Sequence, residues 1–292
     1  MPLLLAPVFN SLTEEPVQID LGQGFQMISG NERLYQFCRR YLRTAMNENK
    51  LHFENKIKPN SLFLLADYPE MKVTDEHRGF VSEIENRLNV ASTHGVGSIP
   101  YLLHIDESKT KYAITYLKRS LDGDKLTYTG STREIFEGLL RTENTFPPVP
   151  YRRYALSLEK ESYEDQLLDL WIALESLFVP DGKKGEITYK VRLRLAYYFG
   201  ATPDERKKLA AFIKTSYNHR SEIAHSGKIL GSKLKEEIAI LRRIVRATLI
   251  NMYTEGVSVQ DMRERLDELV LSGKSYPEVY QPDFFVPMES KP

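Results

Sequence analysis

Cysteine is nearly missing from this sequence, and long apolar runs are missing altogether. Cys38 is the only cysteine, which excludes an internal disulfide framework and a zinc site built from several cysteines. No apolar run approaches the ~20 residues that a membrane-spanning helix needs. The first seven residues are apolar but hold two prolines and no basic residue, so we expect no signal peptide. These absences predict a cytoplasmic protein with no membrane partner.

The formal net charge is zero, because 40 Lys and Arg residues balance 40 Asp and Glu residues. The charges are unevenly placed, however. Residues 183–246 contain 16 basic against 6 acidic side chains, a local charge of +10, so the rest of the chain carries −10. Phosphate binding responds to the local field rather than to the sum. The segment therefore favours a nucleic-acid partner, with solvated helix faces as the alternative interpretation.

A length of 292 residues suggests two domains or one large one. Three prolines stand among four positions at 147–150, a run that we expect neither a helix nor a central strand to tolerate. We place the domain boundary there. Residues 1–146 are predicted to form an α+β domain, residues 151–273 an all-α antiparallel helical bundle, and residues 274–292 an extended tail rich in proline and aromatic residues. The chain is predicted to be mainly α overall.

Apolar periodicity predicts the elements of the first domain. Strands are expected at residues 61–66, 99–105, 112–117 and 126–129, and helices at residues 32–46 and 76–90. Asp122-Gly123 is a good turn pair and predicts a hairpin between the last two strands. Gly22-Gln23-Gly24 lacks the third glycine of a dinucleotide-binding loop, so a simple turn is expected.

The second domain shows helical spacing throughout. Apolar residues recur at steps of three and four from Leu167 to Phe178. Further helices are predicted at residues 187–199, from Pro203 to near Gly227, after Ser232, and at residues 259–271 with Ser258 as the cap. Their short connections favour an antiparallel bundle.

The candidate site lies in the string from Tyr217 to Gly227. At about 100° per residue, Arg220 falls in the middle of the apolar stripe of its helix. A guanidinium there is costly unless it has a partner or faces a wet cleft, and Glu175 is the expected partner. His225 lies about 140° from Arg220 around the helix and in its last turn, where a helix terminus favours imidazolium. A capping histidine without chemistry is the alternative.

Three blocks carry a resemblance to a known family. They are Asp169–Leu177, Tyr189–Ala196 and Tyr217–Gly227, and together they resemble the Apea-like branch of HEPN domains, whose signature is an arginine, a polar residue and a histidine within a few positions. The resemblance spans roughly residues 155–255 and does not extend to the first domain.

The resemblance implies a metal-independent endoribonuclease that dimerises, so that two motifs meet across a two-fold axis. The ribose 2′-hydroxyl would attack the adjacent phosphate, with His225 as acid or base and Arg220 on the phosphate. Ser221 would bind the phosphate or the arginine, and Tyr217 and Glu175 would orient it. His219 is a further supporting residue. Such proteins include toxins and anti-phage effectors, so RNA is the expected partner, and neither a cofactor nor a metal is expected.

Other interpretations remain open. The chain is alternatively a catalytically silent HEPN module for dimerisation, RNA binding or nucleotide binding, or a small-molecule sensor with its ligand between the domains. The first domain is expected to act as a sensor or substrate selector, and a regulatory or antitoxin partner is left unidentified. The predicted RNA contacts are Lys190, Arg194 and Lys228.

Several residues give weaker signals. A basic helix face carries Arg39, Arg40 and Arg43; solvation is the favoured interpretation and RNA contact the alternative. Cys38 is expected to be a buried thiol. The remaining histidines, at positions 52, 77, 94 and 104, show no zinc-ligand spacing.

Overall fold

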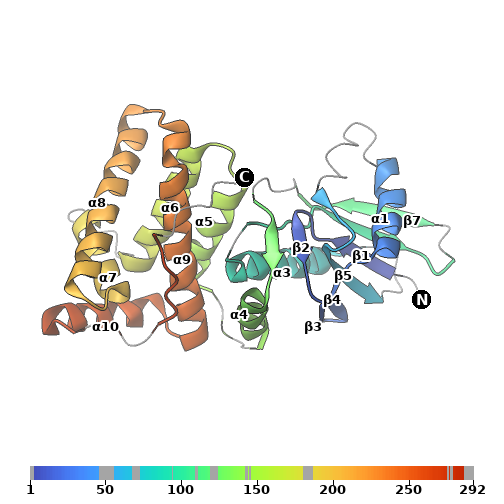
Figure 1. Ribbon diagram of the computed structural model, residues 1–292, viewed down its shortest axis with the longest axis horizontal. Coiled ribbons are helices and arrows are strands. Elements are labelled where there is room, and N and C mark those ends of the chain that lie inside the picture. Colours follow the sequence, from blue (N-terminus) through green and yellow to red (C-terminus); the bar gives the residue numbers. More distant parts are fainter. Residues whose placement is uncertain are drawn as a thin grey trace. The chain divides into compact units, whose positions relative to one another are not determined.

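The computed structural model divides the chain into two compact units, Met1–Arg141 and Thr142–Pro292 (Figure 1). The residues that it describes are 3–45, 56–67, 73–93, 95–108, 111–118, 124–141, 144, 146–179, 187–274, 276 and 279–285. The first unit contains an antiparallel sheet with helices, and the second is helical. The prediction of a mainly α chain with strands in its first part is confirmed.

The first unit is built on a six-stranded sheet in the order β3-β4-β5-β1-β6-β7, in which every neighbouring pair is antiparallel. Its strands are β1 (Leu3–Pro7), β3 (Gln18–Gly22), β4 (Phe25–Ser29), β5 (Leu62–Asp67), β6 (Tyr101–Ile105) and β7 (Tyr112–Tyr116). A separate parallel pair joins β2 (Ser11–Thr13) to β8 (Leu126–Tyr128). The apolar start of the chain, for which no element was predicted, is the inner strand β1.

Helices cover both faces of this sheet, which explains why β1 is apolar at consecutive positions. The helix α1 (Glu32–Ala45) packs Cys38 and Leu42 against Leu5 and Leu103. On the opposite face α3 (Asp75–Ala91) places Phe80 with its ring centroid 5.0 Å from that of Phe25, and α4 (Gly130–Arg141) packs against α3. Burial raises the pKa of the Cys38 thiol to about 12, in agreement with the predicted buried thiol.

The predicted hairpin between residues 112–117 and 126–129 is wrong, since β7 pairs with β6 and β8 pairs with β2. Asn10 gives the physical reason. Its Nδ2 donates to the carbonyls of Val96 and Asp124 at 2.9 and 3.0 Å, and its own carbonyl accepts the Leu126 N–H at 2.9 Å. These long-range bonds hold the start of β8 beside β2. The Asp122-Gly123 pair itself lies outside the described residues.

The predicted turn at Gly22-Gln23-Gly24 is confirmed, because it joins β3 to β4. Gln23 and Gly24 have φ angles of 51° and 77°. Positive φ at both central residues is the geometry of a type I′ hairpin turn.

The second unit consists of six α-helices and one 3₁₀ turn within its described residues. They are α5 (Pro148–Glu159), α6 (Tyr163–Phe178), α7 (Ile187–Phe199), α8 (Pro203–Ser226), η1 (Gly231–Leu234), α9 (Lys235–Glu255) and α10 (Val259–Ser272). Thr202 caps α8 at its start, Gly227 ends it with a φ of 64°, and Ser258 caps α10. The sequence predicted the start of α8 at Pro203, its end near Gly227 and the cap of α10 at Ser258, but it did not single out Thr202.

The expectation that the prolines at 147–150 exclude a helix is wrong. Pro147 is the N-cap of α5, and Pro148 is its first residue. The first turn of a helix has no intrahelical partner for its N–H groups, so proline costs little there.

The described part of the tail, residues 276 and 279–285, forms neither helix nor strand and packs on the second unit. The Tyr280 N–H donates to Asn251 Oδ1 at 2.8 Å, and Asn251 Nδ2 donates back to the Tyr280 carbonyl at 3.1 Å. Arg246 donates to the Tyr280 hydroxyl at 2.7 Å, and Phe284 stacks edge-on against Phe199 with centroids 4.8 Å apart. The tail is therefore fixed to α9 and α7.

Removing the Asn251 side chain tests this attachment. We expect Asn251→Ala to lower the free energy of unfolding by about 1–3 kcal/mol, because a buried amide that makes two hydrogen bonds is lost. The measurement is urea denaturation followed by circular dichroism. Asn218→Ala, an exposed asparagine on α8, is the matched control and should change stability by about 0.5 kcal/mol or less. Equal denaturation midpoints for the two variants would contradict the packing described here.

Candidate functional site

Arg220 reaches from α8 to α6, where its Nη2 lies 3.4 Å from Glu175 Oε1. The predicted ion pair is therefore present. It is not fully buried, since the two side chains are 24% and 23% exposed. Burial raises the pKa of Glu175, and the nearby guanidinium offsets part of that effect. The arginine is thus held by a carboxylate and keeps access to solvent.

Aromatic residues set the position of this arginine. Its Cζ lies 5.8 Å from the centroid of the Tyr217 ring, which meets the Trp171 ring edge-on at 5.3 Å. Trp171 is fully buried, and its Nε1 donates to Ser216 Oγ at 2.9 Å. A buried indole whose N–H is satisfied tolerates little sliding. Trp171 on α6 therefore fixes the register of α8, and with it the place of Tyr217 and Arg220.

His225 lies in the last turn of α8 and is exposed. The helix is regular from Pro203 to Ser226, so the divergence of about 140° between Arg220 and His225 remains. The Gly227 N–H donates to the Ile223 carbonyl and closes the helix directly after the histidine. Within one chain the two side chains therefore lie on different sides of α8.

The segment that follows His225 is tied to the start of α6 by Glu164. Its Oε1 accepts the N–H groups of Leu230 and Gly231 at 2.8 and 2.7 Å, and its Oε2 accepts the Ser162 hydroxyl at 2.9 Å. These hydrogen bonds lower the pKa of Glu164 to about 2, and the one from the Gly231 N–H makes the largest contribution. The sequence gives no signal for this anchor, because a glutamate in the first turn of a helix is ordinary.

His219 binds a second carboxylate that the sequence analysis missed. Its Nδ1 lies 2.6 Å from Glu237 Oε2 on α9, and the Glu237 side chain is 11% exposed. A hydrogen bond from Nδ1–H to a carboxylate leaves Nε2 as the second polar atom of the ring. The pair connects α8 to α9, whereas Arg220 on the same helix contacts α6. Ser221, the residue after Arg220, is half-buried.

Arg194, predicted as an RNA contact, has a structural role instead. Its side chain is 9% exposed, and its Nε and Nη2 each lie 2.8 Å from a carboxylate oxygen of Asp267. Its Nη1 donates to the Phe178 carbonyl. A guanidinium engaged in this way is not presented to a phosphate. The sequence does not reveal a carboxylate partner for Arg194 that lies 73 residues further along the chain.

The other predicted RNA contacts are nearer the surface. Lys228 is exposed and pairs with Glu222, with Nζ 2.7 Å from Oε2, and Lys190 is half-buried on α7. Arg242 lies inside, where its Nη2 donates to the Ser157 carbonyl at 2.8 Å. Some of the basic side chains of residues 183–246 therefore make contacts inside the second unit and do not contribute to a positive surface.

Nothing in the described part of the chain gathers three His, Cys, Asp or Glu side chains as a metal site. His77 accepts the Thr74 N–H at 3.2 Å and caps α3, and His104 is buried in β6. The histidines at 52 and 94 lie outside the described residues. Among the described helices, none is long and apolar enough to cross a membrane.

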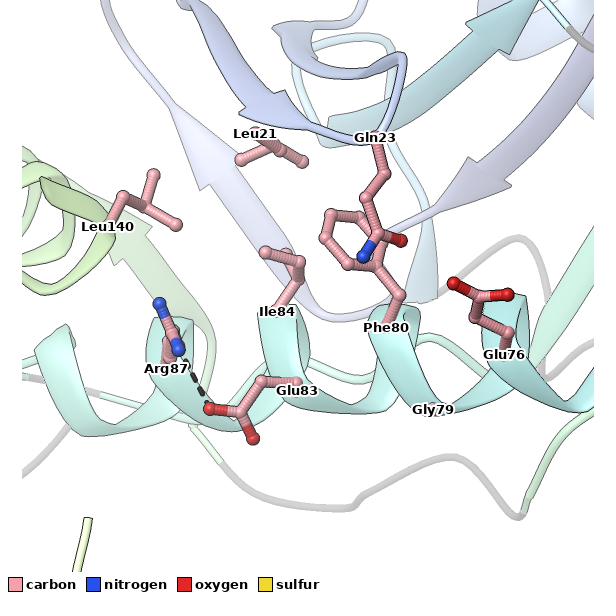
Figure 2. Close-up of a pocket in the computed structure, with 9 residues that line it drawn as sticks. All are labelled: Leu21, Gln23, Glu76, Gly79, Phe80, Glu83, Ile84, Arg87 and Leu140. Atoms are coloured by element: carbon pink, nitrogen blue, oxygen red, sulfur yellow. Dashed lines mark hydrogen bonds and ion pairs between the residues drawn. The ribbon is translucent and has the colours of Figure 1, made fainter. Parts of the chain in front are cut away.

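The first unit has a shallow hollow of about 440 Å³ beside α3 (Figure 2). Its apolar floor consists of Leu21, Phe80, Ile84 and Leu140. At one end Arg87 donates from Nε to Glu83 at 2.9 Å and from Nη1 to the Leu139 carbonyl at 3.0 Å, so its charge is already engaged inside the unit. None of the residues predicted for the site lines this hollow.

Comparison with known proteins adds no relative, because the chain matches no family model, no curated protein and no solved structure.

Proposed function

We propose that the protein is a metal-independent endoribonuclease of the HEPN type, with Arg220 and His225 as its catalytic residues. One observation carries the proposal. Glu175 and Tyr217 hold the Arg220 guanidinium at the surface of α8, and an exposed histidine follows at the end of the same helix. The second unit, in this proposal, is a HEPN-like antiparallel bundle.

The chemistry is internal transfer at a phosphodiester. The ribose 2′-oxygen bonds to phosphorus and loses its proton, the bond from phosphorus to the 5′-oxygen breaks, and the leaving oxygen gains a proton. The products are a 2′,3′-cyclic phosphate and a 5′-hydroxyl. His225 transfers a proton, which contributes about 10²–10⁴-fold in rate. Arg220 binds the phosphate oxygens with two N–H groups and offsets charge in the transition state, with Ser221 as a further donor.

The proposed site requires two copies of the chain. Because Arg220 and His225 diverge around a regular helix, one copy does not place both on one phosphate. A two-fold axis beside the end of α8 would bring the histidine of one copy to the arginine of the other. Ile229, which is 84% exposed just after His225, is an apolar residue suited to such an interface.

The proposed biological role is that of a toxin or anti-phage effector in the cytoplasm. The first unit would then select RNA or sense a trigger, and a regulatory or antitoxin partner would restrain the activity.

A catalytically silent module is the second candidate. It is favoured by the pairing of Arg220 with Glu175 and of Lys228 with Glu222, because both cations are already neutralised within the chain. Incubation of the purified chain with single-stranded RNA in EDTA separates the two: fragments ending in a cyclic phosphate support the nuclease, and intact RNA supports the silent module.

The proposed function makes three predictions, of which the first is that the protein is a homodimer in solution. Multi-angle light scattering at micromolar concentration should give twice the chain mass of 33.8 kDa. A mass near 34 kDa would rule out the composite site.

The second prediction is that cleavage does not depend on a metal. EDTA should leave the activity unchanged, because proton transfer by His225 and the charge of the Arg220 guanidinium take the roles that a bound metal ion has in metal-dependent nucleases. If EDTA abolished cleavage and Mg²⁺ or Mn²⁺ restored it, this mechanism would be wrong.

The third prediction separates the two catalytic residues. We expect His225→Ala to lower turnover by about 10²-fold or more with RNA affinity and stability nearly intact, since the side chain is exposed. Arg220→Ala should stop cleavage and also weaken RNA binding, because a phosphate contact is lost. Arg220→Lys should remain impaired, since it keeps the charge but not the two-pronged geometry.

Single-turnover cleavage and fluorescence anisotropy, measured on the same preparations, check this contrast. Wild-type cleavage by His225→Ala would show that the histidine is only a helix-end residue, and the silent module would then be the better description.

A further inference from the structure

The first unit carries exposed tyrosines on one face of its sheet. In the β6–β7 register, Tyr112 lies opposite Ile105 and Tyr116 lies opposite Tyr101, so both tyrosines are on the face that also carries α1. Strand β7 is at the edge of the sheet. Tyr112 is 39% exposed and Tyr116 is 57% exposed. We refer to Tyr101, Tyr112 and Tyr116 as the aromatic face.

Buried rings fix the exposed ones in place. The Tyr116 and Tyr101 centroids are 5.6 Å apart, and Tyr101 in turn lies 5.9 Å from the buried Phe9. Tyr112 meets the buried Tyr41 of α1 edge-on at 4.9 Å. A ring that is already ordered loses little conformational entropy when a ligand stacks on it.

The helix beside this face is basic. Among the α1 residues whose side chains are described, Arg33 and Arg40 are exposed, and Glu32 is the acidic residue of the helix. The Arg40 Cζ lies 5.9 Å from the Tyr41 ring, the same ring that supports Tyr112. In the turn before β7, Asp106 accepts the Lys111 N–H and the Ser108 hydroxyl.

We propose that the aromatic face, together with Arg33 and Arg40 of α1, binds single-stranded RNA, with bases stacked on Tyr112 and Tyr116. Exposed aromatic rings beside guanidinium groups are the combination that binds unpaired bases and their phosphates. Tyr112 and Tyr116 are four residues apart on one strand, about 13 Å, so they serve two separate bases of an extended chain. The choice of RNA rests on the proposed function, for which the first unit becomes the substrate-holding part.

Binding to a cleavage-deficient full chain tests this inference. Fluorescence anisotropy with a labelled twelve-nucleotide single-stranded RNA is measured for His225→Ala alone and with a second change. Adding Tyr116→Ala should weaken binding about tenfold, whereas Tyr116→Phe should keep the affinity, because the ring remains. Leu271→Ala, which removes an exposed apolar side chain from α10, is the control and should have no effect. Duplex RNA should show no dependence on Tyr116, since its bases are already stacked.

Unchanged affinity in Tyr116→Ala, or equal loss in Tyr116→Ala and Tyr116→Phe, would overturn the stacking site. If strand β7 binds a protein strand instead of RNA, Tyr116→Ala will leave the RNA affinity unchanged. This binding measurement does not depend on catalysis. If the wild-type chain cleaves no RNA, the proposed function is contradicted. The comparison of Tyr116→Ala with Tyr116→Phe still shows whether the aromatic face binds RNA by stacking.

Discussion

The contact between Trp171 and Ser216 is the constraint on which the candidate site depends. The indole is buried between α6 and α8 and satisfies its one N–H on Ser216. The next residue, Tyr217, packs on the same indole, and Arg220, one turn further on, meets Glu175 one turn further along α6. Because side chains four apart share a helix face, a single buried contact fixes both partners of the arginine. Glu164 adds the second constraint, since it holds the segment that follows His225.

The elements governed by local rules could be predicted from the sequence. Pro203, Gly227 and Ser258 mark helix ends in the sequence and in the structure alike, because the signals that start and end a helix act within one turn. The pairing of Arg220 with Glu175 could also be predicted, since an arginine in an apolar stripe needs a carboxylate. Long-range pairing could not. The strand order around β1 and the parallel pairing of β2 with β8 depend on Asn10 and on helices covering both faces, and neither has a local signature.

The basic segment, residues 183–246, shows that contacts distant in sequence also limit what can be predicted about function. Its charge favoured a nucleic-acid partner, yet Arg194 pairs with Asp267 and Arg242 donates to the Ser157 carbonyl. Arg40 of α1, for which solvation was the favoured interpretation, lies 5.9 Å from the Tyr41 ring, against which the exposed Tyr112 packs. Sequence charge therefore indicates how many cations the chain holds, while packing decides which groups each of them contacts.

The central claim is that one active site takes its arginine and its histidine from two copies of the chain, and subunit complementation tests it most directly. Chains carrying Arg220→Ala and chains carrying His225→Ala are each expected to be inactive alone. Mixed and allowed to exchange, half of the dimers are hybrids with one complete site of two, so about one quarter of wild-type cleavage should return. If the mixture stays as inactive as its components while light scattering shows hybrid dimers, the site is not shared and the account is contradicted.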